Sequence, residues 1–481
     1  MRIAAPENPA RRGWLDKQGL RLDAKPYLSG AFAIQRLLER LPVPKVPLKE
    51  VTAGHAGGLY NGPMFKRVYL TDPDHSVPFV GSKDMLVADF GTLPRLRKSD
   101  AESKALGYLR LAPGMTLISC SGFNAGRRSY VRPDMDGFWS SQDVLKVVPD
   151  PEHIGAGYLY AFLASRFGEV LVKGKVYGSA VKHIEPHHIA DLPVPRFGAD
   201  VENEIHELIE EAAQLRADFQ AGLDEATRDL FTTAGLGELL DLRWHEQGRE
   251  LGFTERGLNA TTLRALNFQP RARRVQQRLA SVEHVTLGKL CAGGQLSRGV
   301  RFERVDGGPG KTYSYRLIGQ RQAFWLRPEG RWISKTRTAK EVLAEDETVL
   351  VAAQGTLGEN EVYCRSTLVT GDWQEHAYSE HFLRIRPNMA GFSGAYLFAF
   401  MRSEPAFRLL RSMSAGGKQQ DIHEELRDHV PVPALTEADR DRISETVRDA
   451  YRKRDVADRR EDSAIVKLEH AVESHMVARS R

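Results

Sequence analysis

The sequence predicts an α+β protein made by internal duplication, in which two strand-rich domains are each followed by a long α-helix. The segment YLYAFLAS at 158–165 recurs as YLFAFMRS at 396–403, an offset of 396 − 158 = 238 residues. The tripeptide PVP at 193–195 recurs at 431–433 with the same offset. A long, charged, amphipathic segment then follows each copy. An offset held over such distances indicates a repeat, and therefore a pseudo-two-fold arrangement on one chain.

The two amphipathic segments predict the long helices. Between 201 and 230, apolar residues such as Ile205, Ile209 and Ala212 recur every three or four positions among charged ones. This spacing predicts a helix of roughly 30 residues, about 45 Å long at 1.5 Å per residue. Its counterpart runs from about 437 to 477. We expect the two helices to pair antiparallel as a coiled-coil spacer, although each packing along its own domain is the alternative.

The segments between the long helices set the domain boundaries. Residues 15–41 have apolar residues at helical spacing, while apolar runs at 116–120 and 144–148 predict strands separated by turns. Composition changes abruptly after each PVP, which marks the end of a strand-rich domain. The predicted organisation is an N-terminal arm and helix at 1–47, a strand-rich domain at 48–196, a long helix at 197–232, a helical connector at 233–283, a second strand-rich domain at 284–434 and a second long helix at 435–481.

Composition narrows the class of protein. The 481 residues leave room for two to four domains, and 41% hydrophobic with 27% charged residues is typical of a folded chain. A formal net charge of +5 permits a nucleic-acid-binding surface. The sequence has neither a signal-peptide pattern nor a run of roughly 20 apolar residues, so we expect a cytoplasmic protein. Cys120, Cys291 and Cys364 are too few and too far apart to predict a disulfide framework or a zinc site.

Two strings resemble enzyme motifs. GGPGKT at 307–312 ends like a phosphate-binding loop, but Val305 occupies the position of the first glycine and a strand-like segment follows, so a turn is the better interpretation. Asp74, Glu102 and Lys104 fit the loose PD…ExK pattern of metal-dependent nucleases, which the second copy lacks. The sequence has no glycine-rich methyl-donor loop. Binding is therefore the leading hypothesis, with a metal-dependent nuclease as a weaker alternative.

Basic residues predict contacts with DNA. Positive charge recurs at equivalent positions of both copies, as contacts with the uniform phosphate backbone would require. Lys182 and His183 in the first copy correspond instead to Gln420 and Asp421, and such differences would give each copy its own base preference. Each of these charges is alternatively an ordinary solvated surface group. The residues predicted to contact DNA are Lys83, Arg97, Arg127, Arg128, Lys173, Ser179, Lys182, His183, Arg321, Lys335, Arg411, Lys418, Gln419 and Gln420.

The order of these features resembles the specificity subunit of type I restriction-modification systems. A strand-rich domain, a GYLYAFLAS-type helix, a glycine-containing loop before HIADLPVP and a long amphipathic helix appear in that order and are then repeated, over roughly 15–475. The resemblance implies that each strand-rich domain is a target recognition domain for half of a split DNA sequence. It maps the recognition loops onto 178–183 and 416–421, and implies a non-catalytic subunit with no cofactor of its own.

The resemblance also implies partners. These are double-stranded DNA, two DNA methyltransferase subunits that use S-adenosylmethionine and, in a full restriction complex, motor-nuclease subunits that use ATP and magnesium, acting in phage defence. The segments 15–41 and about 235–280 depart from the family pattern as helical additions. A stand-alone DNA-binding or scaffold protein without a methyltransferase is the alternative from another class.

Overall fold

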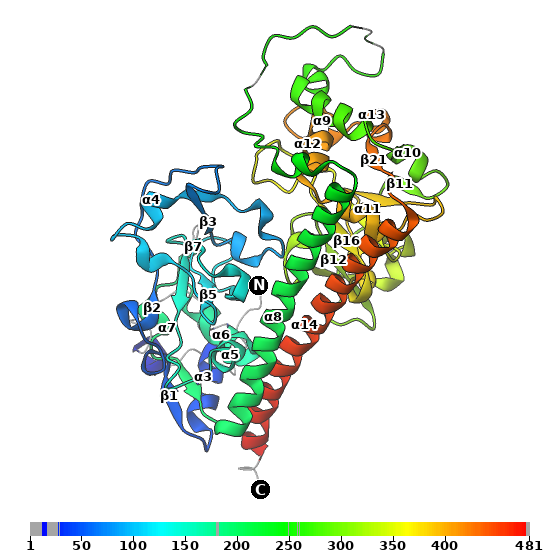
Figure 1. Cartoon of the computed structure of the whole chain (residues 1–481). Coiled ribbons are helices and arrows are strands. Elements are labelled where there is room, and N and C mark those ends of the chain that lie inside the picture. The colour runs from blue at the N-terminus through cyan, green and yellow to red at the C-terminus, as the bar shows by residue number, and fades with distance from the viewer. Residues whose placement is uncertain are drawn as a thin grey trace. The chain divides into compact units, whose positions relative to one another are not determined.

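The structure is a computed structural model that divides the chain into two units (Figure 1). It describes residues 12–16, 27, 29–178, 182–248, 250–256, 258 and 260–477. Unit 1 comprises 1–86, 93–217 and 456–481, and unit 2 comprises 87–92 and 218–455. Each unit therefore contains one strand-rich domain together with part of each long helix.

Unit 1 is built on two small sheets and a two-stranded ladder. The larger sheet is antiparallel with the order β2-β8-β5-β6, and the smaller has the order β4-β3-β7, in which β3 and β7 are parallel. The ladder joins β1 to β9 and closes the beginning of the domain onto its end. The bounds are β1 (Lys45–Pro47), β2 (Leu59–Tyr60), β3 (Ser76–Val80), β4 (Arg95–Arg97), β5 (Thr116–Ser119), β6 (Arg128–Tyr130), β7 (Trp139–Ser140), β8 (Val144–Val147) and β9 (Pro193–Pro195).

Unit 2 repeats this topology strand for strand. Its sheets have the orders β11-β18-β14-β16 and β13-β12-β17, again with one parallel pair, and its ladder joins β10 to β21. A further three-stranded sheet has the order β15-β20-β19. The bounds are β10 (His284–Thr286), β11 (Gln295–Arg298), β12 (Ser314–Ile318), β13 (Arg331–Ser334), β14 (Thr348–Ala352), β15 (Gln354–Gly355), β16 (Ser366–Val369), β17 (Ala377–Tyr378), β18 (Phe382–Arg386), β19 (Ser414–Gly416), β20 (Gln420–Ile422) and β21 (Pro431–Pro433). The predicted fold class is confirmed.

The offset between the copies is not constant, which corrects the prediction of 238 throughout. The pair Val46–Val194 corresponds to Val285–Val432, so the first strands differ by 285 − 46 = 239 and the last by 432 − 194 = 238. In the larger sheets, Ile118 pairs with Leu145 where Val351 pairs with Leu383, so β5 and β14 differ by 351 − 118 = 233. Loops absorb such changes in length while the ladder pairings are kept.

The apolar helix of each copy lies inside its unit. α5 (Ala156–Ala164) and α11 (Gly394–Met401) are apolar on all sides and buried almost throughout, which explains why their sequences remain recognisable. Tyr158 in α5 donates its hydroxyl hydrogen to the carbonyl of Pro195 at 2.5 Å, and Tyr396 in α11 does the same to Pro433 at 2.8 Å. These bonds tie each apolar helix to the PVP strand of its own copy.

A serine caps the next helix in both copies. The hydroxyls of Ser165 and Ser403 accept the backbone N–H of Gly168 and Ala406 and begin α6 (Arg166–Lys175) and α12 (Glu404–Ser412). The other described helices are short, apart from those treated below. Their bounds are α1 (Arg12–Asp16), α4 (Lys98–Ala101), α7 (Pro186–Ile189), α10 (Leu287–Leu290) and α13 (Glu424–Asp428).

The two predicted helical additions contain helices that belong to the repeat. α3 (Ala31–Arg40) packs on α6 and β9, and α9 (Pro270–Ala280) packs on α12 and β21, which are the equivalent elements of unit 2. Leu38 and Leu279 are the fully buried anchors of these contacts. The segment predicted as mostly helical at 15–41 is described only in part, since 17–26 and 28 lie outside the described residues.

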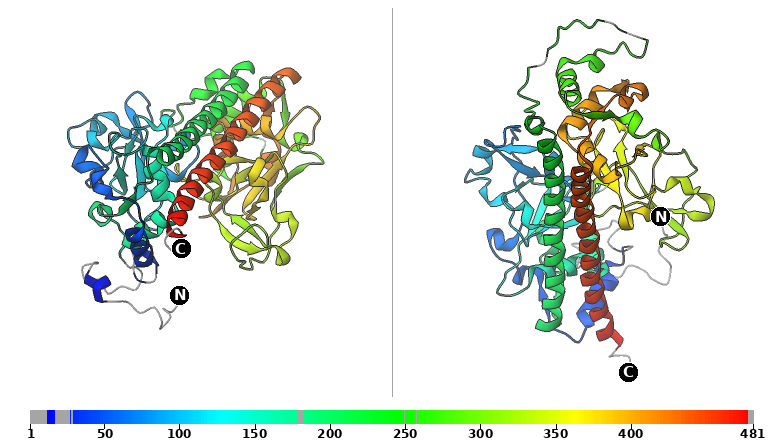
Figure 2. Two further views of the ribbon diagram at one scale, coloured as in Figure 1. Left: turned by 90° about the horizontal axis from the view of Figure 1, so that it is seen from below. Right: turned by 45° about the vertical axis from the view of Figure 1, so that its right-hand side comes forward.

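The long helices are α8 (Ala199–Thr233) and α14 (Glu437–Val477), and they pair antiparallel as predicted. In unit 1, Lys467 contacts Glu204 at 2.7 Å and Arg460 contacts Glu211 at 2.8 Å. In unit 2, Arg442 contacts Asp229 at 2.9 Å, so residues later in α8 meet residues earlier in α14. Figure 2 shows the two helices side by side in both views.

The apolar stripes of both long helices enter both cores. In unit 1, Ile205 and Ile209 from α8 and Leu468 from α14 join the core around α5. In unit 2, residues from both helices likewise pack with α11. Gly157 allows the close approach in unit 1, because a Cβ there would lie 2.5 Å from the carbonyl oxygen of His206 in α8. The alternative, in which each helix packs only along its own domain, is therefore wrong.

Candidate nucleic-acid interface

The two predicted recognition loops occupy the same place in the two units. In unit 2, β19 and β20 form a hairpin whose Asp421 pairs with Ala415 on one side and with Gln354 of β15 on the other. In unit 1, His183 pairs in the same way with Tyr177 and with Ser121. We call the described residues 177–178 and 182–183 the first hairpin, and 414–422 the second hairpin.

Both hairpins contain a glycine with the same backbone φ. Gly178 and Gly416 each have φ +93, in the left-handed region that favours glycine. Ser179, which was predicted to contact DNA, lies outside the described residues. The structural equivalence of the two loops could be predicted because the glycine and the following isoleucine, Ile184 or Ile422, are kept in register.

The second hairpin presents an exposed tip on a fixed base. Lys418 and Gln419 are exposed. Gln420 is only 5% exposed, and its side-chain amide donates to the carbonyl of Gly417. Gln420 therefore shapes the tip rather than facing solvent, so Lys418 and Gln419 are the side chains available to a ligand.

Groups outside the second hairpin hold its base. Arg264 donates to the carbonyl of Gly416 at 2.8 Å, and Tyr363 donates its hydroxyl hydrogen to Ser414 Oγ at 3.0 Å. Arg298 forms an ion pair with Asp421, whose carboxylate is therefore partly neutralised. Contacts with Arg264, Tyr363 and Arg298 thus fix the base of the second hairpin.

The first hairpin lies against the loop that follows β5. The backbone N–H of Gly122 donates to the carbonyl of Lys182 at 2.9 Å, and Ser121 pairs with His183. The side chains of Lys182 and His183 are half-buried. The charge and hydrogen-bonding groups at this position thus differ from those of Gln420 and Asp421 in the second hairpin.

Of the predicted pairs of equivalent cations, one is exposed in both copies. Lys83 is exposed, and the side chain of Arg321 is 61% exposed with Glu361 at 3.6 Å. Arg97 and Lys335 are more constrained. Arg97 forms two hydrogen bonds with Asp100, while Lys335 donates to the carbonyl of Lys311 and lies over the ring of Tyr315.

The third pair, Lys173 and Arg411, differs in exposure between the two copies. Lys173 is exposed and forms an ion pair with Glu169. Its equivalent Arg411 is only 6% exposed and donates to the carbonyls of Leu357 and Gly358 at 2.9 and 2.8 Å. We do not retain Arg411 in the interface, because its guanidinium holds a loop of its own protein.

The adjacent arginines of the first copy are also used internally. Arg128 donates to the carbonyl of Ala164 at 2.6 Å and to Glu169 at 3.0 Å, so it joins β6 to the helices behind it. Arg127 is half-buried. A run of arginines in a sequence therefore does not show which of them faces solvent.

Sequence reasoning missed an exposed aromatic residue beside the first hairpin. Phe123 lies one residue after Gly122 and is 87% exposed. The signal available in the sequence is an aromatic residue between turn formers in SGFNAG. It also missed two buried cations at equivalent ladder positions, Lys146 on β8 and Arg384 on β18, whose partners are Leu117 and Leu350.

The enzyme-like strings form no catalytic arrangement among the described residues. Asp74 is exposed in a turn, and Glu102 faces Lys98 at 4.0 Å. Residues 307–312 form a turn before β12, as the interpretation of GGPGKT predicted. In the described part of the chain, no three His, Cys, Asp or Glu side chains gather as a metal ion would require.

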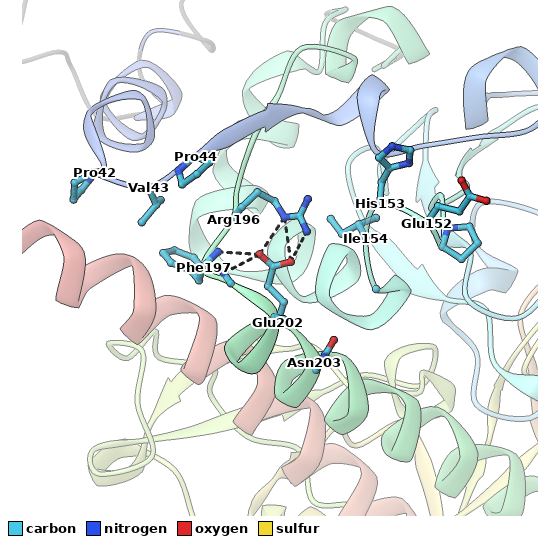
Figure 3. Close-up of a pocket in the computed structure, with 14 residues that line it drawn as sticks. Pro42, Val43, Pro44, Glu152, His153, Ile154, Arg196, Phe197, Glu202 and Asn203 are labelled. Carbon is cyan, nitrogen blue, oxygen red and sulfur yellow. Dashed lines mark hydrogen bonds and ion pairs between the residues drawn. The ribbon is translucent and has the colours of Figure 1, made fainter.

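A pocket of about 590 Å³ lies where the chain enters α8 (Figure 3). Glu202 lines this pocket and accepts hydrogen bonds from Arg196 Nε at 3.0 Å and from the backbone N–H of Phe197 at 2.9 Å. Pro42, Val43 and His153 are among the other lining residues. The carboxylate of Glu202 and the guanidinium of Arg196 form an ion pair with each other. We therefore interpret these two charges as stabilising the start of α8.

Comparison with known proteins gives structural likenesses only. No family model and no curated protein matches the chain. The S subunit of a type I restriction-modification system from M. genitalium is 11% identical, with a TM-score of 0.35 over 91% of this chain and 96% of that chain. The HsdS subunit from Thermoanaerobacter tengcongensis is 12% identical, with a TM-score of 0.25 over 89% and 96%.

A third similar chain comes from a study of complex assembly and conformational transition of the type I R-M system. It is 14% identical, with a TM-score of 0.27 over 90% of this chain and 98% of that chain. At these values the function has to be argued from the chain's own residues. Within the part of the chain that the structure describes, none of the helices has the length and apolar character that a membrane span requires.

Proposed function

We propose that the chain is a non-catalytic, sequence-specific DNA-binding subunit that recognises a bipartite, asymmetric target. The observation that carries this proposal is the pair of hairpins, which share one backbone frame but present different side chains. Lys182 and His183 occupy the positions in the first hairpin that Gln420 and Asp421 occupy in the second. The second hairpin also exposes Lys418 and Gln419 at its tip. Arg and Lys suit guanine edges and Gln suits adenine edges, so each hairpin would prefer different bases.

Exposed cations supply the sequence-independent part of binding. Lys83 and Arg321 occupy equivalent, exposed positions next to the smaller sheets of the two units. A duplex presents the same phosphates at both half-sites, so a cation kept in both copies suits backbone contacts while the hairpin tips vary.

The proposal extends to partners. A DNA-binding chain without a catalytic arrangement of its own would direct another activity to its target. We propose that this activity is adenine methylation by two DNA methyltransferase subunits using S-adenosylmethionine, and that motor-nuclease subunits using ATP and magnesium join in a restriction complex. Such subunits would assemble on the exposed faces of α8 and α14.

Mapping of methylated bases tests this proposal. The chain is expressed in cells together with the reading frames that neighbour it, and genomic methylation is compared with that of cells lacking only this chain. We expect methylated adenines in a motif of two specified blocks separated by unspecified bases, and their loss when the chain is absent. Methylation that is the same with and without the chain would overturn the proposed role.

A further inference from the structure

The loop after β5 carries an aromatic side chain that the fold does not use. Phe123 is 87% exposed, whereas other phenylalanines of unit 1, such as Phe162 and Phe167, are in the core. Exposure of one large apolar side chain is common on protein surfaces, so its position and support decide whether it has a role.

The backbone holds this loop in a defined conformation. The N–H of Ala125 donates to Gly122 at 3.2 Å, that of Gly126 to Ser119 at 2.8 Å and that of Arg127 to Asn124 at 2.9 Å. Gly122 and Gly126 have φ +71 and +87, where residues with a Cβ would be strained. Phe123 therefore projects from a turn that is already formed, which limits the entropy lost when its ring is ordered by a ligand.

The same loop is attached to the first hairpin. Gly122 donates to the carbonyl of Lys182 at 2.9 Å, and Ser121 pairs with His183. On its other side, a Cβ on Gly126 would lie 3.2 Å from Cγ of Lys173 in α6. The loop that carries Phe123 thus lies beside Lys182 and His183, which the proposed function assigns to base recognition.

We propose that Phe123 is a wedge that stacks against or between bases of the half-site read by unit 1. The inference rests on the proposed function and adds a local distortion of the DNA to it. Apolar side chains inserted at a base step unstack it, and aromatic rings stack on any base regardless of sequence. A docking site for a protein would need a contiguous apolar patch, whereas Phe123 stands between Gly122 and Asn124.

The second unit has no equivalent wedge. Its corresponding loop, 353–365, contains one aromatic residue, Tyr363, which is fully buried. Leu357 is the exposed apolar residue of that loop, and its carbonyl accepts from Arg411. Distortion is therefore expected in one half-site only, which would make the two halves of the target unequal in shape as well as in sequence.

Fluorescence of 2-aminopurine tests the wedge, because this base brightens when it is unstacked. The target is first selected from random duplexes, and the half-site read by unit 1 is identified as the one whose base preference changes in Lys182→Ala. 2-Aminopurine is then placed at successive positions of both half-sites. We expect the full-length protein to raise the fluorescence at one step of the unit 1 half-site and at none of the other.

Variants of two exposed residues distinguish stacking by Phe123 from the loss of any exposed apolar side chain. Phe123→Ala should abolish the fluorescence rise and weaken binding by about 5- to 100-fold, the range for losing one stacked base. Phe123→Trp should retain both. Met64→Ala, which removes another exposed apolar side chain of unit 1, should change neither.

The outcomes distinguish this inference from the proposed function. Sequence-specific binding without a fluorescence rise, or a rise that persists in Phe123→Ala, would overturn the wedge and leave the proposed function in place. Absence of any base preference in the wild-type protein would overturn both.

Discussion

At the scale of single residues, the duplication has kept a buried cation at equivalent positions of both cores, where it donates to backbone carbonyls. Lys146 is 0% exposed and donates to the carbonyls of Ser141 and Val144 at 3.4 and 2.9 Å. Its equivalent Arg384 donates to carbonyls that include Val342 at 2.9 Å. Burial lowers the pKa of both groups, but only the lysine reaches the physiological range, at about 7.

Lys146 should make the stability of unit 1 depend on pH. Its folded-state pKa lies below the unfolded value of about 10.4, so between about pH 7 and 10 the unfolded chain binds more protons. The cost of burying the charge is fully present below pH 7 and disappears as pH rises, with a slope of at most about 1.4 kcal/mol per pH unit. Urea unfolding from pH 6.5 to 9 should show this rise, and Lys146→Met should flatten it. Equal slopes in both proteins would contradict the assignment.

Lys83 and Arg321 should act on DNA binding without changing base preference. Each contributes one phosphate contact in our proposal, so Lys83→Ala or Arg321→Ala should lower the slope of log K against log salt by roughly one unit and weaken binding to all duplexes about equally. Titrations over a range of salt concentrations measure this slope. Arg128→Gln serves as the comparison, because Arg128 bonds within the protein and loss of its charge should leave the slope unchanged. A change of base preference in Lys83→Ala would contradict the sorting of contacts.

At the scale of elements, equivalent buried arginines of α8 and α14 make different polar contacts in the two units. Arg216 in unit 1 is buried and contacts Asp458 at 2.7 Å and Glu461 at 2.5 Å, and Glu461 also accepts the hydroxyl of Tyr160. The repeat places Arg454 at the equivalent position of unit 2. It is buried as well, but it pairs with its neighbour Asp455 and lies over the ring of Trp373.

Removing the buried arginine should therefore be costly in unit 1. Arg216→Met leaves two carboxylates without their partner in a buried place, so we expect a loss of about 3–5 kcal/mol in the free energy of unfolding. The exposed pair between Arg460 and Glu211 joins the same two helices, yet Arg460→Ala should lose about 0–1 kcal/mol. Denaturant unfolding compares the two variants. Similar small losses in both would show that the buried cluster does not stabilise the pairing.

Local patterns in the sequence predicted the elements but not the orientation of their polar side chains. The long amphipathic helices follow from periodicity, and the repeats of YLYAFLAS and PVP mark equivalent places in the two copies. Arg411 appeared equivalent to Lys173, yet α12 is buried from Pro405 to Ser412 and turns this arginine inward. Phe123 was missed because only the tertiary structure shows that its loop lies beside a hairpin. Side-chain direction depends on packing between elements distant in sequence.

At the scale of the whole molecule, duplication gives one chain two copies of a strand-rich domain with a hairpin, and the two hairpins carry different side chains. The ladders, the apolar helix and its tyrosine bond are kept in both units, while Lys182 and Gln419 have no like counterpart at the equivalent place. A single chain with two unlike reading units would not need a palindromic target, unlike a symmetric dimer.

Selection of bound duplexes from a random-sequence pool tests this central claim most directly, using the wild-type chain, Lys182→Ala and Gln419→Ala. The account predicts two separated blocks of specified bases for the wild type, with Lys182→Ala relaxing positions in one block and Gln419→Ala relaxing positions in the other. A single uninterrupted block, or two variants that relax the same positions, would contradict it.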